Sequence, residues 1–161
     1  MSHMQLYLAA DHAGFALKEK LKTRLAKQGY EIFDVTPTFH AGDDYPLVAK
    51  ELSSYVQRTA YDVQRDQKRG TRHVVRGTKG LLICGSGIGV CIASNRHKGI
   101  RAAVGHDAKE VKLAREHNDI NILCLSGRLT KINDAIKMIE IFLKTKKSKE
   151  ARHARRVKQL S

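Results

Sequence analysis

The sequence lacks tryptophan and has few prolines, few cysteines and no long apolar run. Among its 161 residues there are two prolines and three cysteines. A helix that spans a bilayer needs roughly 20 apolar residues in succession, so we expect no transmembrane segment. The first residues lack the apolar core of a signal peptide, and Met1, Ser2 and His3 look like a vector-derived leader ahead of a native Met4.

The three cysteines are odd in number and irregularly spaced, and all lie in apolar stretches: Cys84, Cys91 and Cys124. No pair of them has the spacing of zinc ligands. We therefore expect reduced thiols, a cytoplasmic location and no metal site.

Acidic residues are scarce, with 16 Asp and Glu against 30 Lys and Arg, and the formal net charge is +14. Residues 65–79 hold six basic residues and one acid, and residues 144–158 hold eight and one. These +5 and +7 segments account for twelve of the fourteen charges. Such clusters suit RNA, acidic surfaces or phosphorylated small molecules, and they are equally typical of a solvated basic face.

Short apolar runs alternate along the chain with segments in which apolar residues recur at helical spacing. This pattern predicts one α/β domain over residues 1–161. The expected fold is a three-layer α/β/α sandwich around a five-stranded parallel sheet, Rossmann-like, with strands buried on both faces. Residues 63–79 lack periodicity and are predicted to be an exposed basic insertion, and residues 144–161 a basic terminal helix. The predicted strands are 5–10, 30–35, 80–84, 100–104 and 120–125, and the predicted helices are 13–29, 46–62, 88–96, 108–117 and 133–143.

Parallel sheets bind ligands beyond the carboxyl ends of their strands. That rule selects the segment 11–14, the loop with Asp44 and Tyr45, and the glycine-rich loop 84–89, which we expect to share one edge of the sheet.

The glycine-rich loop runs into a predicted helix, so its amides and the helix dipole can face a ligand. Cys84 ends the preceding strand, where these dipoles favour the thiolate. The alternative interpretation is a small apolar side chain in the core. A dinucleotide-binding loop would follow the first strand, and this loop follows the third.

Several stretches resemble the ribose-5-phosphate isomerase B family, which has galactose-6-phosphate isomerase relatives. The similarity runs from about residue 5 to residue 157 and is interrupted at 63–79. It is carried by "AADHAGFALKEKL", "DYP", "GLLICGSGIGVCIASNRHKGIRAAV", "AREHNDINILCLSGR" and "ARHARRV".

The resemblance implies isomerisation of aldose and ketose phosphates through a cis-enediolate, without metal or cofactor. The base would be Cys84, because the carboxylate that serves as base in the other branch of the family is replaced here by Val90. The enediolate would be bound by donors of the glycine-rich loop, which are the Ser86 hydroxyl and the amides of Gly85, Ser86, Gly87, Ile88 and Gly89.

The resemblance also implies that His117 opens the sugar ring as an acid and that Asn118 contacts the substrate. His117 precedes the fifth strand, at the opposite edge from Cys84, so a neighbouring chain would supply it in a homodimer or homotetramer. Arg128 would come from the same neighbour. Without the resemblance, His117 is a surface residue at a helix end.

The remaining expected contacts with substrate lie near both ends of the chain. Asp11 alone is a helix cap, and Tyr45 alone is a packing residue; the tail arginines suit a phosphate because guanidinium groups bind it in a bidentate manner. The residues are Asp11, His12, Tyr45, Arg152, His153 and Arg156.

The predicted activity is interconversion of ribose 5-phosphate and ribulose 5-phosphate. One alternative keeps the chemistry and changes the substrate to galactose 6-phosphate or allose 6-phosphate. The other is an RNA-binding module that uses the two basic segments, although neither segment contains interleaved aromatic residues.

Overall fold

The chain alternates strands and helices as predicted. The computed structural model describes residues 5–69 and 78–160. In chain order the elements are β1 (Gln5–Ala10), α1 (Phe15–Lys27), β2 (Glu31–Asp34), α2 (Tyr45–Arg69), β3 (Lys79–Cys84), α3 (Ile88–Ser94), β4 (Ala102–Val104), α4 (Ala108–Asn118), β5 (Ile122–Ser126), α5 (Ile132–Lys144) and α6 (Ala151–Gln159).

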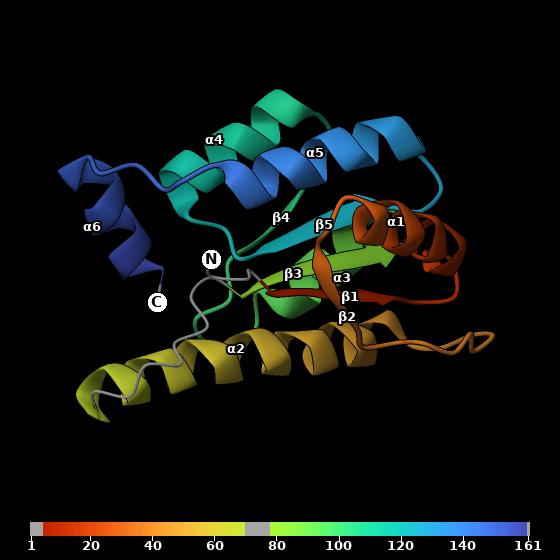
Figure 1. Cartoon of the computed structure of the whole chain (residues 1–161), viewed down its shortest axis with the longest axis horizontal. Helices are drawn as coiled ribbons and strands as arrows, with labels where there is room; N and C mark the ends of the chain where they lie inside the picture. Colours follow the sequence, from red (N-terminus) through yellow and green to blue (C-terminus); the bar gives the residue numbers. More distant parts are fainter. Residues whose placement is uncertain (1–4, 70–77, 161) are drawn as a thin grey trace.

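The sheet is parallel throughout, with the strand order β2-β1-β3-β5-β4 (Figure 1). Ala10 pairs with Ile83, and Cys84 pairs with Ser126. The carboxyl ends of β1, β3 and β5 therefore lie next to one another, and the loops that follow them share one edge of the sheet.

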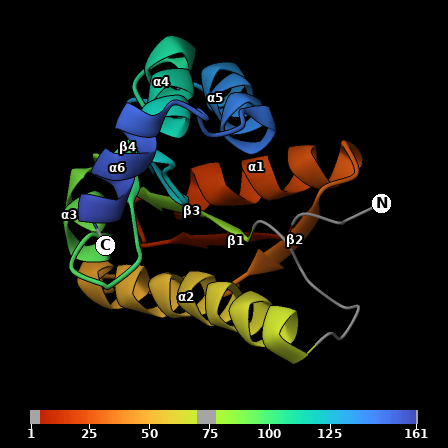
Figure 2. The same cartoon turned by 90° about the vertical axis from the view of Figure 1, so that its left-hand side faces the viewer.

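Helices cover both faces of the sheet, which confirms the three-layer architecture. Helices α1, α4 and α5 lie on one face, and α2 and α3 lie on the other (Figures 1 and 2). β3 and β5 are buried along their whole length. β2 alternates between exposed and partly buried residues, so the expectation of burial on both faces was wrong for this strand, because it lies at the end of the sheet.

The predicted basic insertion differs from what the structure shows at both of its ends. α2 does not end at Asp62 but continues to Arg69, because residues 63–69 contain no glycine or proline and favour a helix. Lys79 is the first residue of β3 and is buried rather than exposed. Residues 70–77 of the predicted insertion, like the predicted leader Met1 to His3, lie outside the described residues.

The basic tail forms a separate helix, as expected, although it is shorter than predicted. α5 extends through Lys144, residues 145–150 are irregular, and α6 covers Ala151–Gln159. α6 packs against α4 at the edge where the strands begin (Figure 1). No helix in the described ranges combines the length and apolar character that crossing a bilayer requires.

Candidate active site

The glycine-rich loop connects the buried end of β3 to the start of α3. Gly87 precedes α3 in the left-handed conformation, with φ of 79°. A Cβ atom at this position would also lie 3.0 Å from the carbonyl carbon of Leu125. A side chain is therefore unfavourable at Gly87 for conformation as well as for space, and the loop can pass close to β5.

The Cys84 side chain is both packed and hydrogen-bonded. The residue is only 4% exposed and belongs to the apolar cluster between the sheet and helices α2 and α3. Its sulfur accepts a hydrogen bond from the Gly87 amide at 3.1 Å. Cys84 at the carboxyl end of β3 therefore packs in the core and also contacts a loop amide. The sequence analysis had treated these two possibilities as alternatives.

Asp11 follows β1 and lies against the end of β3. Its amide donates to the Ile83 carbonyl at 3.2 Å, and its Oδ1 accepts from the amides of Ala13 and Gly14 at 3.0 and 2.9 Å. The carboxylate therefore organises the turn that leads into α1, although the residue that directly precedes α1 is Gly14. Asp11 is therefore not the N-cap of α1; its carboxylate instead binds amides of the turn before the helix.

His12 and Tyr45 are held by contacts with neighbouring loops. The Asp43 Oδ1 accepts from the His12 amide at 2.7 Å and lies 3.0 Å from His12 Nδ1. Tyr45, the first residue of α2, lies over the glycine-rich loop so closely that a Cβ at Gly89 would be 2.7 Å from its ring. Sequence analysis missed Asp43. The residue could have been found, because it is an acid next to Asp44 in a loop that was already expected to lie at the carboxyl edge of the sheet.

Ser126 and Arg128 join the same site from the loop after β5. The Ser126 hydroxyl donates to the Gly85 carbonyl at 2.7 Å. A Cβ at Gly85 would lie 3.3 Å from Cζ of Arg128. Within one chain Arg128 thus lies beside its own glycine-rich loop, because β5 lies beside β3. That a neighbouring chain supplies an Arg128 to this site stays a prediction. Ser126 was not predicted, and the motif "LSGR" after a buried strand was its only signal.

A cavity of about 190 Å³ opens between the loops that follow β3, β4 and β5. Ser86 and Ile88 line it from the glycine-rich loop, and Ser126 and Thr130 line it from the loop after β5. The glycine-rich loop therefore borders open space at the carboxyl edge of the sheet, where a small ligand is expected, although Cys84 itself does not line this cavity.

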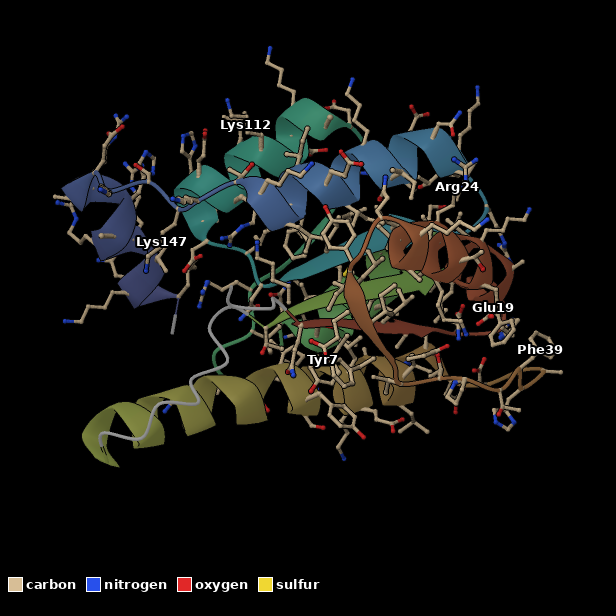
Figure 3. All side chains as sticks on the ribbon, in the orientation of Figure 1. Tyr7, Glu19, Arg24, Phe39, Lys112 and Lys147 are labelled. Atoms are coloured by element: carbon tan, nitrogen blue, oxygen red, sulfur yellow. The ribbon has the colours of Figure 1, made fainter. Side chains whose placement is uncertain are left out.

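The remaining predicted residues form a second group at the opposite edge of the sheet. His117 lies in the last turn of α4, and its ring stacks on that of His153 from α6. A cavity of about 200 Å³ lies between the two helices, and Lys147, labelled in Figure 3, contributes to its lining. Arg152 pairs with Glu150 at 2.7 Å, Arg156 is exposed on α6, and Asn118 is exposed at the end of α4.

Comparison with known proteins connects this fold to one enzyme family. A family model described as Ribose/Galactose Isomerase matches residues 6–65 and 67–160. The chain belongs to this family. It is 37% identical to the probable ribose-5-phosphate isomerase B of Mycoplasma pneumoniae over 158 residues, which cover 98% of this chain and 92% of that protein.

Solved structures of the Ribose/Galactose Isomerase family share the fold over nearly the whole chain. The ribose-5-phosphate isomerase B of Clostridium thermocellum is 32% identical, with a TM-score of 0.82 and coverage of 98% of this chain and 95% of the other. The enzyme of Mycoplasma genitalium, solved with bound ribulose 5-phosphate, is 32% identical, with a TM-score of 0.73 and coverage of 99% and 95%. The resemblance noted in the sequence is thereby confirmed.

Proposed function

We propose that this chain interconverts ribose 5-phosphate and ribulose 5-phosphate, with Cys84 as the base. The observation that carries the proposal is the hydrogen bond from the Gly87 amide to the Cys84 sulfur, at the start of a loop whose Ser86 and Ile88 line an open cavity. Family membership supports the reaction class, and ribulose 5-phosphate is the molecule bound to the Mycoplasma genitalium relative.

In the proposed reaction the Cys84 thiolate removes the proton from the carbon next to the aldehyde. The electron pair forms an enediolate, whose negative oxygen is stabilised by the amides of the glycine-rich loop and the Ser86 hydroxyl. A proton passes from the C2 hydroxyl to the former aldehyde oxygen, and the thiol returns its proton to the former aldehyde carbon. The carbonyl then lies at C2, which is the ketose, and the thiolate is regenerated. No electron is gained or lost overall, so the residues named need no redox partner.

The substrate contacts follow from the groups around this edge. Asp11 offers its carboxylate toward the sugar hydroxyls, and His12, held by Asp43, faces the phosphate end. Tyr45 and Arg128 border the loop. A cytoplasmic location belongs to the same proposal and agrees with three free cysteines.

In this proposal the acid His117 comes from a second copy of the chain. The end of α4, which carries His117, lies at the opposite edge of the sheet from the end of β3, which carries Cys84 (Figure 1). The glycine-rich loop is surrounded by exposed apolar side chains that a second copy would cover, namely Ile88, Ile92 and Leu129. In this arrangement Asn118 and the tail residues Arg152, His153 and Arg156 complete the partner's site.

A coupled isomerase assay across sugar phosphates tests the proposal. We expect turnover of ribose 5-phosphate and ribulose 5-phosphate to exceed that of galactose 6-phosphate and allose 6-phosphate. A preference for the six-carbon substrates would keep the chemistry and change the substrate, and no turnover of any sugar phosphate would contradict the proposal.

A further inference from the structure

Helices α4 and α6 meet through two stacked imidazole rings. The centroids of His117 and His153 lie 4.2 Å apart, and the ring planes are inclined by only 5°. His153 is 6% exposed, whereas His117 is partly exposed. One ring of the pair can therefore reach a ligand and the other is enclosed behind it.

The enclosed ring, that of His153, lacks a close hydrogen-bond acceptor at Nε2 among the described residues. Nε2 of His153 has no hydrogen-bond partner within residues 5–69 and 78–160, and the Glu150 carboxylate lies 3.9 Å away. Burial, together with the neighbouring His117 and Arg152, lowers the pKa of His153. The charged groups that surround the pair come from α4, from the connection to α6 and from α6 itself: Glu116, Asp119, Lys147, Glu150, Arg152, Arg156 and Lys158.

We propose that His153 is a positioning residue that keeps the pair's single proton on His117 and fixes the orientation of that ring. Burial disfavours a charge on the enclosed His153 ring, and two protonated rings at this separation would repel each other. The inference rests on the proposed function, in which His117 donates a proton to the sugar ring oxygen. It gives His153 a role that acts through His117 rather than through the substrate.

The stack also couples the acid to the phosphate-binding tail. The connection into α6 is fastened to α4 by the Ser148 amide, which donates to the Glu116 carbonyl at 2.8 Å, and by Lys147 Nζ, which lies 3.9 Å from the Asp119 carboxylate. His117 therefore has its aromatic partner only while α6 is docked. The proton donor and the tail arginines would thus approach the second copy as one preformed unit.

The test is an NMR titration of the histidine rings in the full chain, compared with the variants His153→Phe and His153→Ala. We expect the wild-type His117 signals to show two steps, its own protonation and a second step at lower pH when His153 titrates. His153→Phe keeps an aromatic face without a titrating nitrogen, so the His117 signals should show one step. In His153→Ala the second step should also be absent, and the His117 ring signals should move because the stacked ring no longer lies over them.

Arg155→Ala is the matched control, because it removes a charge from α6 and leaves the stack in place. We expect it to preserve both steps. Identical His117 titrations in the wild type and both His153 variants would overturn the inference. The titration needs no turnover, so uncoupled rings in an active isomerase contradict the inference alone, and coupled rings in a chain without isomerase activity contradict only the proposed function.

Discussion

At the scale of single residues, the proposed chemistry depends on one sulfur atom at the end of a strand. Cys84 shares its apolar cluster with Cys124, and Cys91 packs against that cluster from α3. Only Cys84 lies at the start of the glycine-rich loop with a loop amide directed at its sulfur. The Cys91 thiol instead donates to the Ala102 carbonyl at 3.4 Å, which supports a packing role for that residue.

We expect Cys84→Ser to reduce kcat by about 10²- to 10⁴-fold, the usual contribution of a positioned base, because a serine hydroxyl is far less acidic than a thiol. The measurement is steady-state turnover of ribose 5-phosphate. Cys91→Ser is the matched control and should remain within about twofold of the wild type, because a hydroxyl can still donate to Ala102. Equal losses in the two variants would identify a packing defect and contradict the assignment of Cys84 as base.

At the scale of secondary-structure elements, a buried lysine ties the start of β3 to the end of α5. Lys79 Nζ donates to the carbonyls of Phe142 and Leu143 at 2.6 and 3.0 Å, where a helix leaves its last carbonyls unpaired. Burial, and secondarily the charge of Arg115, lowers the pKa of Lys79 to about 7. A neutral amine can still donate to both carbonyls, so deprotonation leaves this connection in place.

This lysine predicts a rise in stability with pH. Its pKa in the folded chain, about 7, lies below the ordinary 10.5, so between these values the unfolded chain binds more protons than the folded chain. The free energy of unfolding should therefore increase with pH across this window, by up to about 1.4 kcal/mol per pH unit. Urea unfolding at pH 7, 8, 9 and 10 measures the slope for wild type and for Lys79→Met.

The increase in the free energy of unfolding with pH should be smaller in Lys79→Met, because this variant lacks the titrating amine. All other titrating groups, including the cysteines, are common to both proteins, so the difference between the two slopes is the contribution of Lys79. Lys112→Met, at an exposed position on α4 (Figure 3), should keep the wild-type slope. A difference in stability between wild type and Lys79→Met that stays constant from pH 7 to 10 would contradict the assignment.

At the scale of the whole molecule, one chain carries two half-sites at opposite edges of its sheet. The edge with Cys84 holds the proposed base and the loop amides, and the edge with His117 holds the proposed acid and the tail arginines. Leu129, 81% exposed beside the loop after β5, is the most exposed of the large apolar side chains among the described residues. Such exposure is expected where a second copy packs.

Mixed assemblies test this arrangement directly. Cys84→Ala and His117→Asn should each be inactive, but a co-expressed mixture should recover about a quarter of wild-type activity, since half of the dimers are mixed and each has one intact site. A double variant carrying both changes in one chain, mixed with wild type, gives the reference for random pairing. No recovery in the mixture would show that each chain builds its site from its own residues.

Local sequence was sufficient for much of this protein. Apolar periodicity identified the strands and most of the helices within a few residues, because the pattern of burial along an element depends on its own side chains. The end of α2 and the start of α6 were each misplaced by seven residues. The edge shared by Asp11, Tyr45 and the glycine-rich loop also followed from sequence, since parallel strands bring their carboxyl ends together.

Only the tertiary structure decided which of these loops touch. Arg128 lies against the glycine-rich loop of the same chain because β5 is the neighbour of β3 in the sheet. His153 stacks on His117 because α6 docks on α4. No local signal encodes such contacts, because strand order and helix docking depend on burial summed over residues far apart in the chain. The sequence alone thus determined the elements and the chemistry of the loop, and long-range packing determined how the side chains are grouped.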